Sequence, residues 1–171
     1  MTHFNRLPEQ EQEQRLLELA YQALPEWRLS GELQLIKYRE NAVYALRTDS
    51  GERYALRVHR DNYHSDASLR SELLWMRALQ QAGIGVPATL PTATNDPFAS
   101  VTTDRVGEAR QVDLMPWVEG RQIGSMEAGL GDDPQAIRNI YLTLGRLAAR
   151  MHNQACDWVL PEGFTRHAWD S

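Results

Sequence analysis

Three stretches of the chain carry apolar residues every three to four positions, which is the spacing that places them on one face of a helix. The first covers residues 9–24, behind an acidic and glutamine-rich first turn, and Pro25 ends it. The second covers about residues 65–82, where a serine or an aspartate can cap the first turn and a glycine follows the last. The third covers about residues 133–152 and begins at an Asp-Pro pair. The pattern therefore predicts three helices.

Shorter stretches rich in β-branched and aromatic residues, separated by turn residues, predict strands over residues 33–39, 42–48, 53–59, 99–106 and 109–118. Two hairpins in series make the first three strands an antiparallel meander, and a Gly-Glu turn joins the last two. The order is helix, three strands, helix, two strands, linker, helix. We expect an α+β fold in which a five-stranded antiparallel sheet carries one packed helix, with an N-terminal helix before it and the start of a helical region after it.

Composition narrows the function classes for this chain of 171 residues. Hydrophobic residues make up 42%, enough for a core, and the net charge is −5. An acidic chain without a run of Lys or Arg argues against nucleic acid as a partner. No apolar run is long enough to span a membrane, and residues 1–6 lack the apolar core of a signal peptide. With Cys156 as the only cysteine, we predict a cytoplasmic protein.

Arg57 and Glu72 form the most informative pair. Arg57 lies in a predicted strand and points to the opposite sheet face from its two apolar neighbours. Glu72 lies on the apolar stripe of the second helix, three residues after Leu69 and four before Met76, where a carboxylate needs a cationic partner. We therefore expect Arg57 and Glu72 to face each other. The pair can hold nucleotide phosphates, or it can be a surface ion pair worth about 0–1 kcal/mol.

Two other segments and one residue pair are candidates for binding. The turn at residues 38–44, which includes Asn41 and Ala42, can place backbone amides over phosphates, although it contains no glycine and also fits an ordinary hairpin. The segment 114–120 ends a strand and leads into a linker. Its extended backbone can pair with the edge of an adenine ring or serve only as a crossover. His152 and Cys156 have the spacing of two metal ligands, but no second pair completes a site.

Together these features resemble the amino-terminal lobe of the aminoglycoside-phosphotransferase-like kinase family, which has a protein-kinase-like fold and includes choline kinases. The similarity runs from about Leu33 to Trp169. Its matching segments are Glu40-Asn41-Ala42-Val43-Tyr44, Tyr54-Ala55-Leu56-Arg57-Val58-His59-Arg60, Ser71-Glu72-Leu73, Pro116-Trp117-Val118-Glu119-Gly120-Arg121 and residues 144–152.

The resemblance implies a role for each matched position. Arg57 takes the place of a phosphate-binding Lys or Arg, and Glu72 that of its helix partner. Asn41 and Ala42 belong to the phosphate-covering loop. The hinge whose backbone meets adenine corresponds to Met115, Pro116, Trp117 and Val118. ATP or GTP and Mg²⁺ are the implied cofactors of the complete enzyme, with a small-molecule hydroxyl as acceptor.

The resemblance also implies a division into a kinase-like lobe with the N-terminal helix at 1–115, a hinge at 116–121, and the start of a helical lobe at 122–171. The family's His-x-Asp catalytic loop does not follow His152, after which only Asp157 and Asp170 remain. The first hypothesis is therefore the nucleotide-binding part of a small-molecule kinase, inactive by itself, whose catalytic part is missing. The alternative is a stand-alone, non-catalytic lobe that binds a nucleotide or a protein. In a third hypothesis, the Arg57–Glu72 pair has only a structural role.

The last predicted helix indicates that the chain associates with another copy of itself. Its apolar face is broad, and in a kinase of this type the larger lobe would cover it. We expect the fragment to form a homodimer, or to swap this segment with a partner, so that Ile140, Leu144, Leu147 and Trp158 are buried between subunits.

Overall fold

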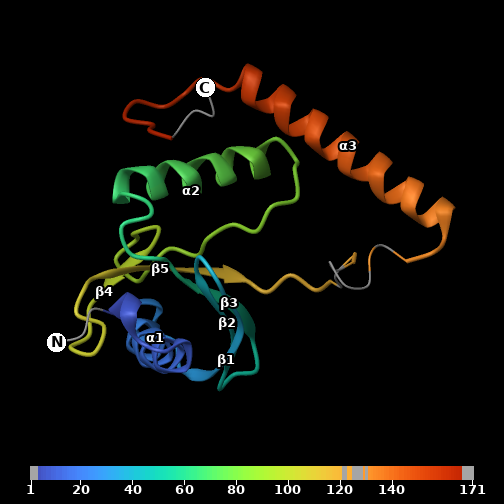
Figure 1. Ribbon diagram of the computed structural model, residues 1–171. Helices are drawn as coiled ribbons and strands as arrows, with labels where there is room; N and C mark the ends of the chain where they lie inside the picture. The colour runs from blue at the N-terminus through green and yellow to red at the C-terminus, as the bar shows by residue number, and fades with distance from the viewer. Residues whose placement is uncertain (1–3, 121–122, 125–128, 130, 167–171) are drawn as a thin grey trace.

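The computed structural model describes residues 4–120, 123–124, 129 and 131–166. Arg121, Trp169 and Asp170 lie outside the described residues. The elements follow one another in the order η1 (Phe4–Arg6), α1 (Glu9–Ala23), η2 (Leu24–Trp27), β1 (Gly31–Tyr38), β2 (Ala42–Thr48), β3 (Arg53–Val58), α2 (Asp66–Gln81), β4 (Ala99–Val101), β5 (Arg110–Pro116) and α3 (Pro134–Asp157) (Figure 1).

The five strands form one antiparallel sheet in the order β1-β2-β3-β5-β4, which confirms the predicted α+β class. β4 ends five residues earlier than predicted. The reason is a turn, in which the backbone N–H groups of Val106 and Gly107 donate to the carbonyl of Thr103 at 3.2 and 2.8 Å. Conversely, α3 continues five residues beyond the predicted end at His152.

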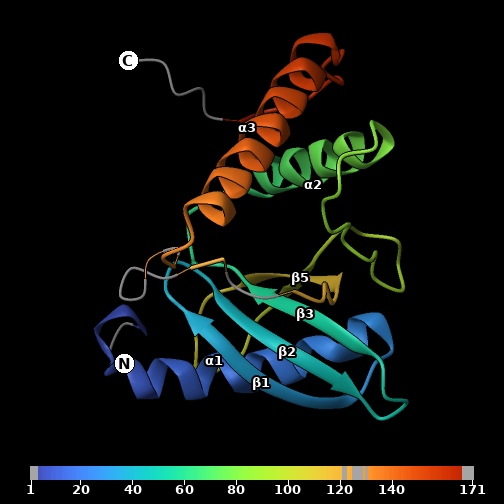
Figure 2. The same ribbon diagram turned by 90° about the vertical axis from the view of Figure 1, so that its right-hand side faces the viewer.

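The main core lies between α1 and one face of the sheet, as Figure 2 shows from the side. Alternate strand residues point into it, because side chains along a strand alternate between its two faces. Those that are almost fully buried include Tyr44 on β2, Leu56 on β3 and Leu114 on β5, which meet Leu16 and Leu19 of α1. The N-terminal helix, which the sequence left unassigned to either face, is therefore the principal cover of the sheet.

α2 lies on the other side of the sheet from α1 (Figures 1 and 2). The hydroxyl of Ser65 caps it by accepting from the N–H of Ser68 at 3.2 Å, so the serine rather than the aspartate is the cap. Its apolar stripe forms a separate small core in which Leu69 and Leu73 contact Phe98. α1 therefore covers one face of the sheet, whereas the face toward α2 is only partly filled with apolar side chains.

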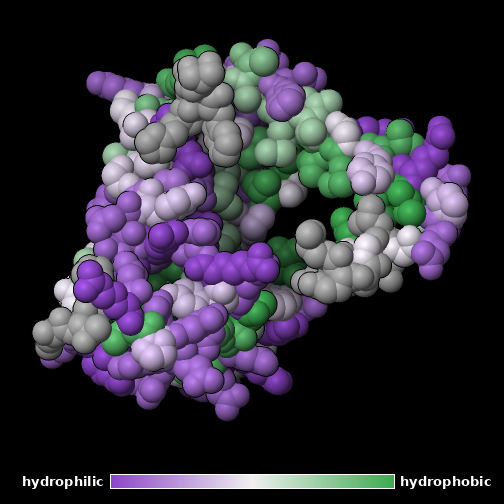
Figure 3. All heavy atoms as spheres, in the orientation of Figure 1, coloured by the Kyte–Doolittle hydropathy of each residue, from purple (hydrophilic) through white to green (hydrophobic). Residues whose placement is uncertain are grey.

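α3 contacts the rest of the chain through its second half. Trp75 Nε1 donates to Gln154 Oε1 at 3.0 Å, and Arg150 Nη2 donates to the carbonyl of Gly83 at 2.7 Å. No residue of this helix is buried, and Leu144 is 47% exposed. In Figure 3 apolar side chains gather over α3 at the right, beside a hollow. None of the helices in the described ranges has the length and hydropathy that a membrane crossing requires.

Candidate functional site

Arg57 is placed by the register of the sheet. It lies opposite Asp113, because β3 pairs with β5 and these two residues are Cα partners. The two side chains share one sheet face and meet edge to edge. Arg57 Nη2 lies 2.7 Å from Asp113 Oδ2, and Nε lies 3.2 Å from both carboxylate oxygens. This arrangement is a charge-assisted contact between a planar fork and a carboxylate, which fixes orientation as well as charge.

Glu72 reaches the same guanidinium from α2. Its Oε1 atom lies 3.3 Å from Arg57 Nη2, so the predicted ion pair between strand and helix is present. The side chain of Glu72 is 21% exposed and that of Arg57 is 19% exposed. The pair is therefore neither fully exposed nor fully buried, and the carboxylate on the apolar stripe has the cation that its position requires.

Asp113 is the residue that the sequence reasoning missed. It is fully buried and contacts two cationic or potentially cationic groups, Arg57 and His59, whose Nε2 lies 2.8 Å from Asp113 Oδ2. Burial by itself would raise the pKa of Asp113, but the hydrogen bond of His59 and the charge and hydrogen bonds of Arg57 outweigh it, so the pKa is lowered. For Arg57, burial would lower the pKa, and Asp113 and then Glu72 raise it. Both groups are therefore charged.

A second arginine approaches Glu72 from the end of the described chain. Arg166 Nη1 lies 3.0 Å from Glu72 Oε2, on the carboxylate oxygen that Arg57 does not contact. Beside it, the N–H of Thr165 donates to the hydroxyl of Ser71 at 2.9 Å. The segment after α3 is therefore attached to the same turn of α2 that supplies Glu72, and the sequence contained no signal for this contact.

The hydrogen bonds leave one nitrogen of Arg57 available. Asp113 and Glu72 occupy Nε and Nη2, whereas Nη1 has no hydrogen-bond partner within the part of the chain that the structure describes. A guanidinium held along one edge can still donate from the other, which a lysine ammonium cannot do in a fixed direction. The site can therefore bind an anion at Nη1 without first breaking its internal contacts.

The surface around Arg57 is apolar and half-buried. Strand alternation places Val43 and Ala45 of β2, Ala55 of β3 and Met115 of β5 on the face that carries Arg57, and all four are partly exposed. Small apolar side chains around a few directed polar groups are typical of ligand sites. The same alternation in the sequence could have identified these four positions.

The turn between β1 and β2 is held to the end of β3. Asn41 Oδ1 accepts from the N–H of Arg60 at 3.1 Å, so the amide side chain of Asn41 closes the turn. The side chain of Ala42 is 1% exposed and lies in the core on the α1 side. Of these two predicted binding residues, Ala42 can therefore reach a ligand on the Arg57 side only through its backbone, while Asn41 positions the turn.

The predicted hinge begins in the sheet and leaves it. The N–H of Trp117 donates to the carbonyl of Arg53 at 3.2 Å, and the Arg53 guanidinium lies 4.2 Å above the Trp117 ring. Pro116 ends β5, and Val118 beyond it is 66% exposed. Met115 lies on the face of Arg57, and Val118 lies outside the strand.

No three His, Cys, Asp or Glu side chains within the described ranges come together as a metal site. Cys156 is exposed near the end of α3. Both carboxylates of the Arg57 cluster are engaged by arginines, which makes them poor candidates for a cation.

Comparisons with known proteins agree with this geometry. The model of the phosphotransferase enzyme family matches residues 32–170. The structure of a microcompartment-associated aminopropanol kinase is similar, with 29% identity and a TM-score of 0.74 over 90% of this chain and 45% of that one. The structure of an amicoumacin kinase in complex with AMP-PNP, Ca²⁺ and Ami has 23% identity and a TM-score of 0.66 over 96% of this chain and 45% of that one.

None of the curated proteins matches the chain. The chain spans less than half the length of the two solved kinases described above. These likenesses confirm the predicted protein-kinase-like fold, in which the sheet with α2 corresponds to the amino-terminal lobe.

Proposed function

The chain belongs to the phosphotransferase enzyme family, and from that premise we propose that the face of the sheet around Arg57 binds the phosphates of ATP or GTP for transfer to a small-molecule hydroxyl. The observation that carries this proposal is how the guanidinium of Arg57 is held. Its guanidinium is oriented by Asp113 and Glu72, and Nη1 is left to donate to a phosphate oxygen.

The remaining parts of the nucleotide have matching positions. Adenine lies over the half-buried apolar face that includes Ala55 and Met115, with its edge against the backbone at Val118. The turn that Asn41 ties to β3 lies over the phosphates. In this division, residues 1–115 form the nucleotide-binding lobe, 116–121 the hinge and 122–171 the first part of a helical lobe.

The acceptor belongs to the whole protein rather than to this lobe. Similarity to an aminopropanol kinase favours a small amino alcohol as the first acceptor to test. Mg²⁺ would accompany the nucleotide, and Glu72 and Asp113 would not hold it, because both are paired with arginines. An acidic chain of this kind acts on small molecules in the cytoplasm rather than on nucleic acid or membranes.

By itself, the 171-residue chain binds nucleotide and does not transfer phosphate. The sequence contains His-x-Asp at residues 59–61 and 64–66, but both lie between the end of β3 and the first residue of α2, and His59 is buried against Asp113. No such motif follows His152. Incubation with Mg-ATP and aminopropanol, choline, homoserine or an aminoglycoside is expected to give no turnover above buffer, and clear turnover would contradict this part of the proposal.

The alternative is a non-catalytic lobe that binds nucleotide or a protein partner. The charges of the Arg57 cluster favour this alternative, because Arg57 and Arg166 neutralise Glu72 and Asp113 without any ligand. A gene whose reading frame continues beyond residue 171 into a His-x-Asp motif supports the enzyme, and a natural stop supports the alternative.

Nucleotide titration tests the central proposal. We expect AMP-PNP with Mg²⁺ to bind the chain in calorimetry, and Arg57→Gln to weaken binding roughly tenfold or more, as for the loss of a hydrogen bond to a charged group. Arg77→Gln is the matched control, since Arg77 is an exposed arginine on α2. Arg57→Lys keeps the charge but loses the fork, and its affinity should fall between the two. If nucleotide does not bind, or if Arg57→Gln in a folded protein binds as the control does, the cluster is only structural.

The exposed face of α3 supports a proposal about assembly. Leu144 and Leu147 are 47% and 38% exposed, and they lie on the same side of the helix as Ile140. Two copies of the chain that bury this face against each other remove it from water. We therefore propose that the 171-residue chain forms a homodimer through α3.

A further inference from the structure

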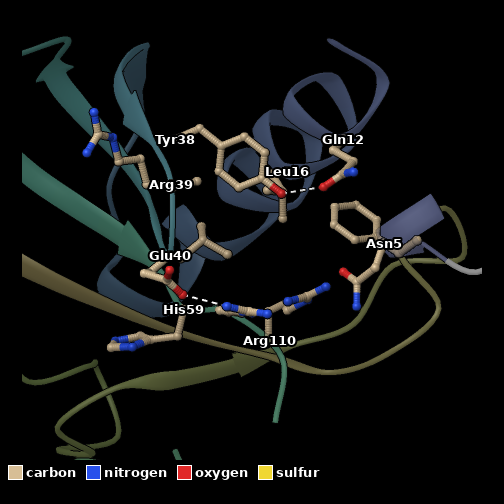
Figure 4. Close-up of a pocket in the computed structure, with 12 residues that line it drawn as sticks. Asn5, Gln12, Leu16, Tyr38, Arg39, Glu40, His59 and Arg110 are labelled. Carbon is tan, nitrogen blue, oxygen red and sulfur yellow. Dashed lines mark hydrogen bonds and ion pairs between the residues drawn. The ribbon is translucent and has the colours of Figure 1, made fainter. Parts of the chain in front are cut away.

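A cavity of about 310 Å³ lies on the side of the sheet that faces α1. Its walls include Gln12 of α1, Tyr38 and Glu40 at the β1–β2 turn, and Arg110 at the start of β5, which Figure 4 shows in close-up. Residues of η1 and of the end of β3 complete the lining. Tyr38 donates its hydroxyl to Gln12 Oε1, which closes one wall. The volume is at the lower end of the range for small-molecule sites, so any occupant is small.

This cavity is distinct from the surface around Arg57. Ala42 and Val58 line it, and both belong to the core on the α1 face, whereas Arg57 lies next to Val58 on the opposite face. The β1–β2 turn and the end of β3 therefore separate two spaces. A ligand of the first cannot also be in contact with the guanidinium of Arg57.

Arg110 is the main cation of the cavity. It is 3% exposed, and its guanidinium lies 4.8 Å from the centre of the Phe4 ring. Its Nη2 atom donates to Glu108 at 2.8 Å, but Nε is buried and has no hydrogen-bond partner within the described chain. Glu108 is the one carboxylate in the described chain that pairs with it, and the positive charge of a buried guanidinium in the wall favours an anion in the cavity beside it.

Arg60 provides a second cation at the mouth of the cavity. Its Nη1 atom lies 2.6 Å from Glu40 Oε2, and both side chains are more than half exposed. Such a surface pair is weak, so an anion can displace Glu40 from Arg60 at small cost. The positive charges of both arginines act on Tyr38 in the cavity wall. Burial raises the pKa of Tyr38, and the charges of Arg110 and Arg60 oppose that rise.

We propose that this cavity binds a phosphate group, free or as a small phosphomonoester, between Arg110 and Arg60. Two planar guanidinium groups are suited to the several oxygens of a phosphate, which accept paired hydrogen bonds. Asn5, which lines the cavity beside them, adds a neutral amide donor. The site does not depend on nucleotide binding at Arg57.

The cavity is also connected to the Arg57 cluster. His59 lines it, but its ring turns away from the cavity, and Nε2 contacts Asp113 at 2.8 Å. Asp113 in turn holds Arg57. A chain of contacts therefore runs from a residue of the cavity wall to the carboxylate that orients Arg57.

Titration of the ¹⁵N-labelled chain with inorganic phosphate, followed by NMR, tests the proposal. We expect saturable shifts at the amides of Tyr38, Arg39 and Arg110 that exceed those at Arg57 and Glu72. A second titration with glycerol phosphate distinguishes an ester from free phosphate, and acetate at equal ionic strength measures the response to an ordinary carboxylate.

Three variants assign the effect to the cavity. Arg60→Gln should weaken phosphate binding roughly tenfold, as for a lost hydrogen bond to a charged group. Glu40→Gln, which frees Arg60, should tighten it severalfold. Arg138→Gln on α3 is the matched control and should bind as the unmodified chain does.

The proposal is overturned if the shifts rise linearly without saturation, if acetate produces the same shifts at the same concentrations, or if Arg60→Gln binds phosphate as tightly as Arg138→Gln. Saturation centred on Arg57 and Glu72 would also overturn it, because that result places the phosphate in the nucleotide site. If nucleotide fails to bind but phosphate saturates the cavity, the proposed function fails and this inference stands.

Discussion

Arg57 and Asp113 lie opposite each other on β3 and β5, and Arg57 Nη2 approaches Asp113 Oδ2 to 2.7 Å. The helix carboxylate of Glu72 is farther from the same nitrogen, at 3.3 Å. Asp113 is fully buried, whereas Glu72 is partly exposed. The strand carboxylate therefore fixes the orientation of Arg57, and Glu72 on α2 is the partner that can be exchanged.

This order of contacts predicts unequal effects on stability. Asp113→Asn leaves Arg57, which is mostly buried, without its principal counter-charge and should lower the free energy of unfolding by about 3 kcal/mol or more. Glu72→Gln should cost about 1 kcal/mol or less, because that pair is partly in water. Urea denaturation of both variants measures the difference.

A double-mutant cycle shows whether the loss comes from the pair itself. Arg57→Met combined with Asp113→Leu should be much less destabilising than the sum of the single variants, because neither charge is then left buried alone. Simple additivity would show that the two side chains are not coupled, and would contradict the assignment of Asp113 as the orienting partner.

The lowered pKa of Asp113 predicts how stability depends on pH. The folded pKa lies below the unfolded value, which is about 3.9 for an ordinary aspartate, so the stabilisation is fully present above that pH. It is lost as the pH falls through the folded pKa. As the pH falls below about 4, the free energy of unfolding should therefore decrease less steeply for Asp113→Asn than for the unmodified chain. Parallel curves would contradict the lowered pKa.

The sequence sufficed for the helices, for four of the five strands to within about three residues, and for the Arg57–Glu72 pair. That pair could be inferred because a carboxylate on an apolar helix stripe is locally anomalous. Asp113 also interrupts an apolar strand, between Val112 and Leu114, and this was the available signal. Its partner, however, is 56 residues away in the chain, and only the register between β3 and β5 brings the two together.

The local sequence pattern was also insufficient to predict that α1 covers one face of the sheet. α1 has a clear apolar stripe, but its periodicity does not say which sheet face it meets. Its burial depends on the alternate residues of three strands, among them Tyr44, Leu56 and Leu114. The contact of Arg166 with Glu72 is likewise set by the path of the chain after α3, for which the sequence has no periodic signal.

Arg166 should attach the segment after α3 without contributing much to global stability. Its ion pair with Glu72 is partly exposed, so Arg166→Gln should change the free energy of unfolding by less than about 1 kcal/mol. Amides of residues 158–166 should nevertheless exchange with solvent deuterium faster, because the segment loses one of its two polar contacts with α2. Glu162→Gln in the same segment is the control. Equal exchange in the two variants would show that Arg166 does not hold the segment.

The exposed face of α3 should determine the oligomeric state of the 171-residue chain. Ile140, Leu144, Leu147 and Trp158 would be buried between two copies, and sedimentation at micromolar concentration should show a dimer. Leu144→Glu places a charge in that interface and should shift the chain to monomer.

Arg146→Gln is the matched control for the dimer. It lowers the net charge by one unit, as Leu144→Glu does, but the 100° step per residue places it on the opposite side of α3. It should therefore remain dimeric at the same concentration. If the unmodified chain is monomeric, the half-exposed leucines of α3 tolerate water without a partner, and the assembly proposal fails. If both variants dissociate equally, the change of charge rather than the apolar face controls association.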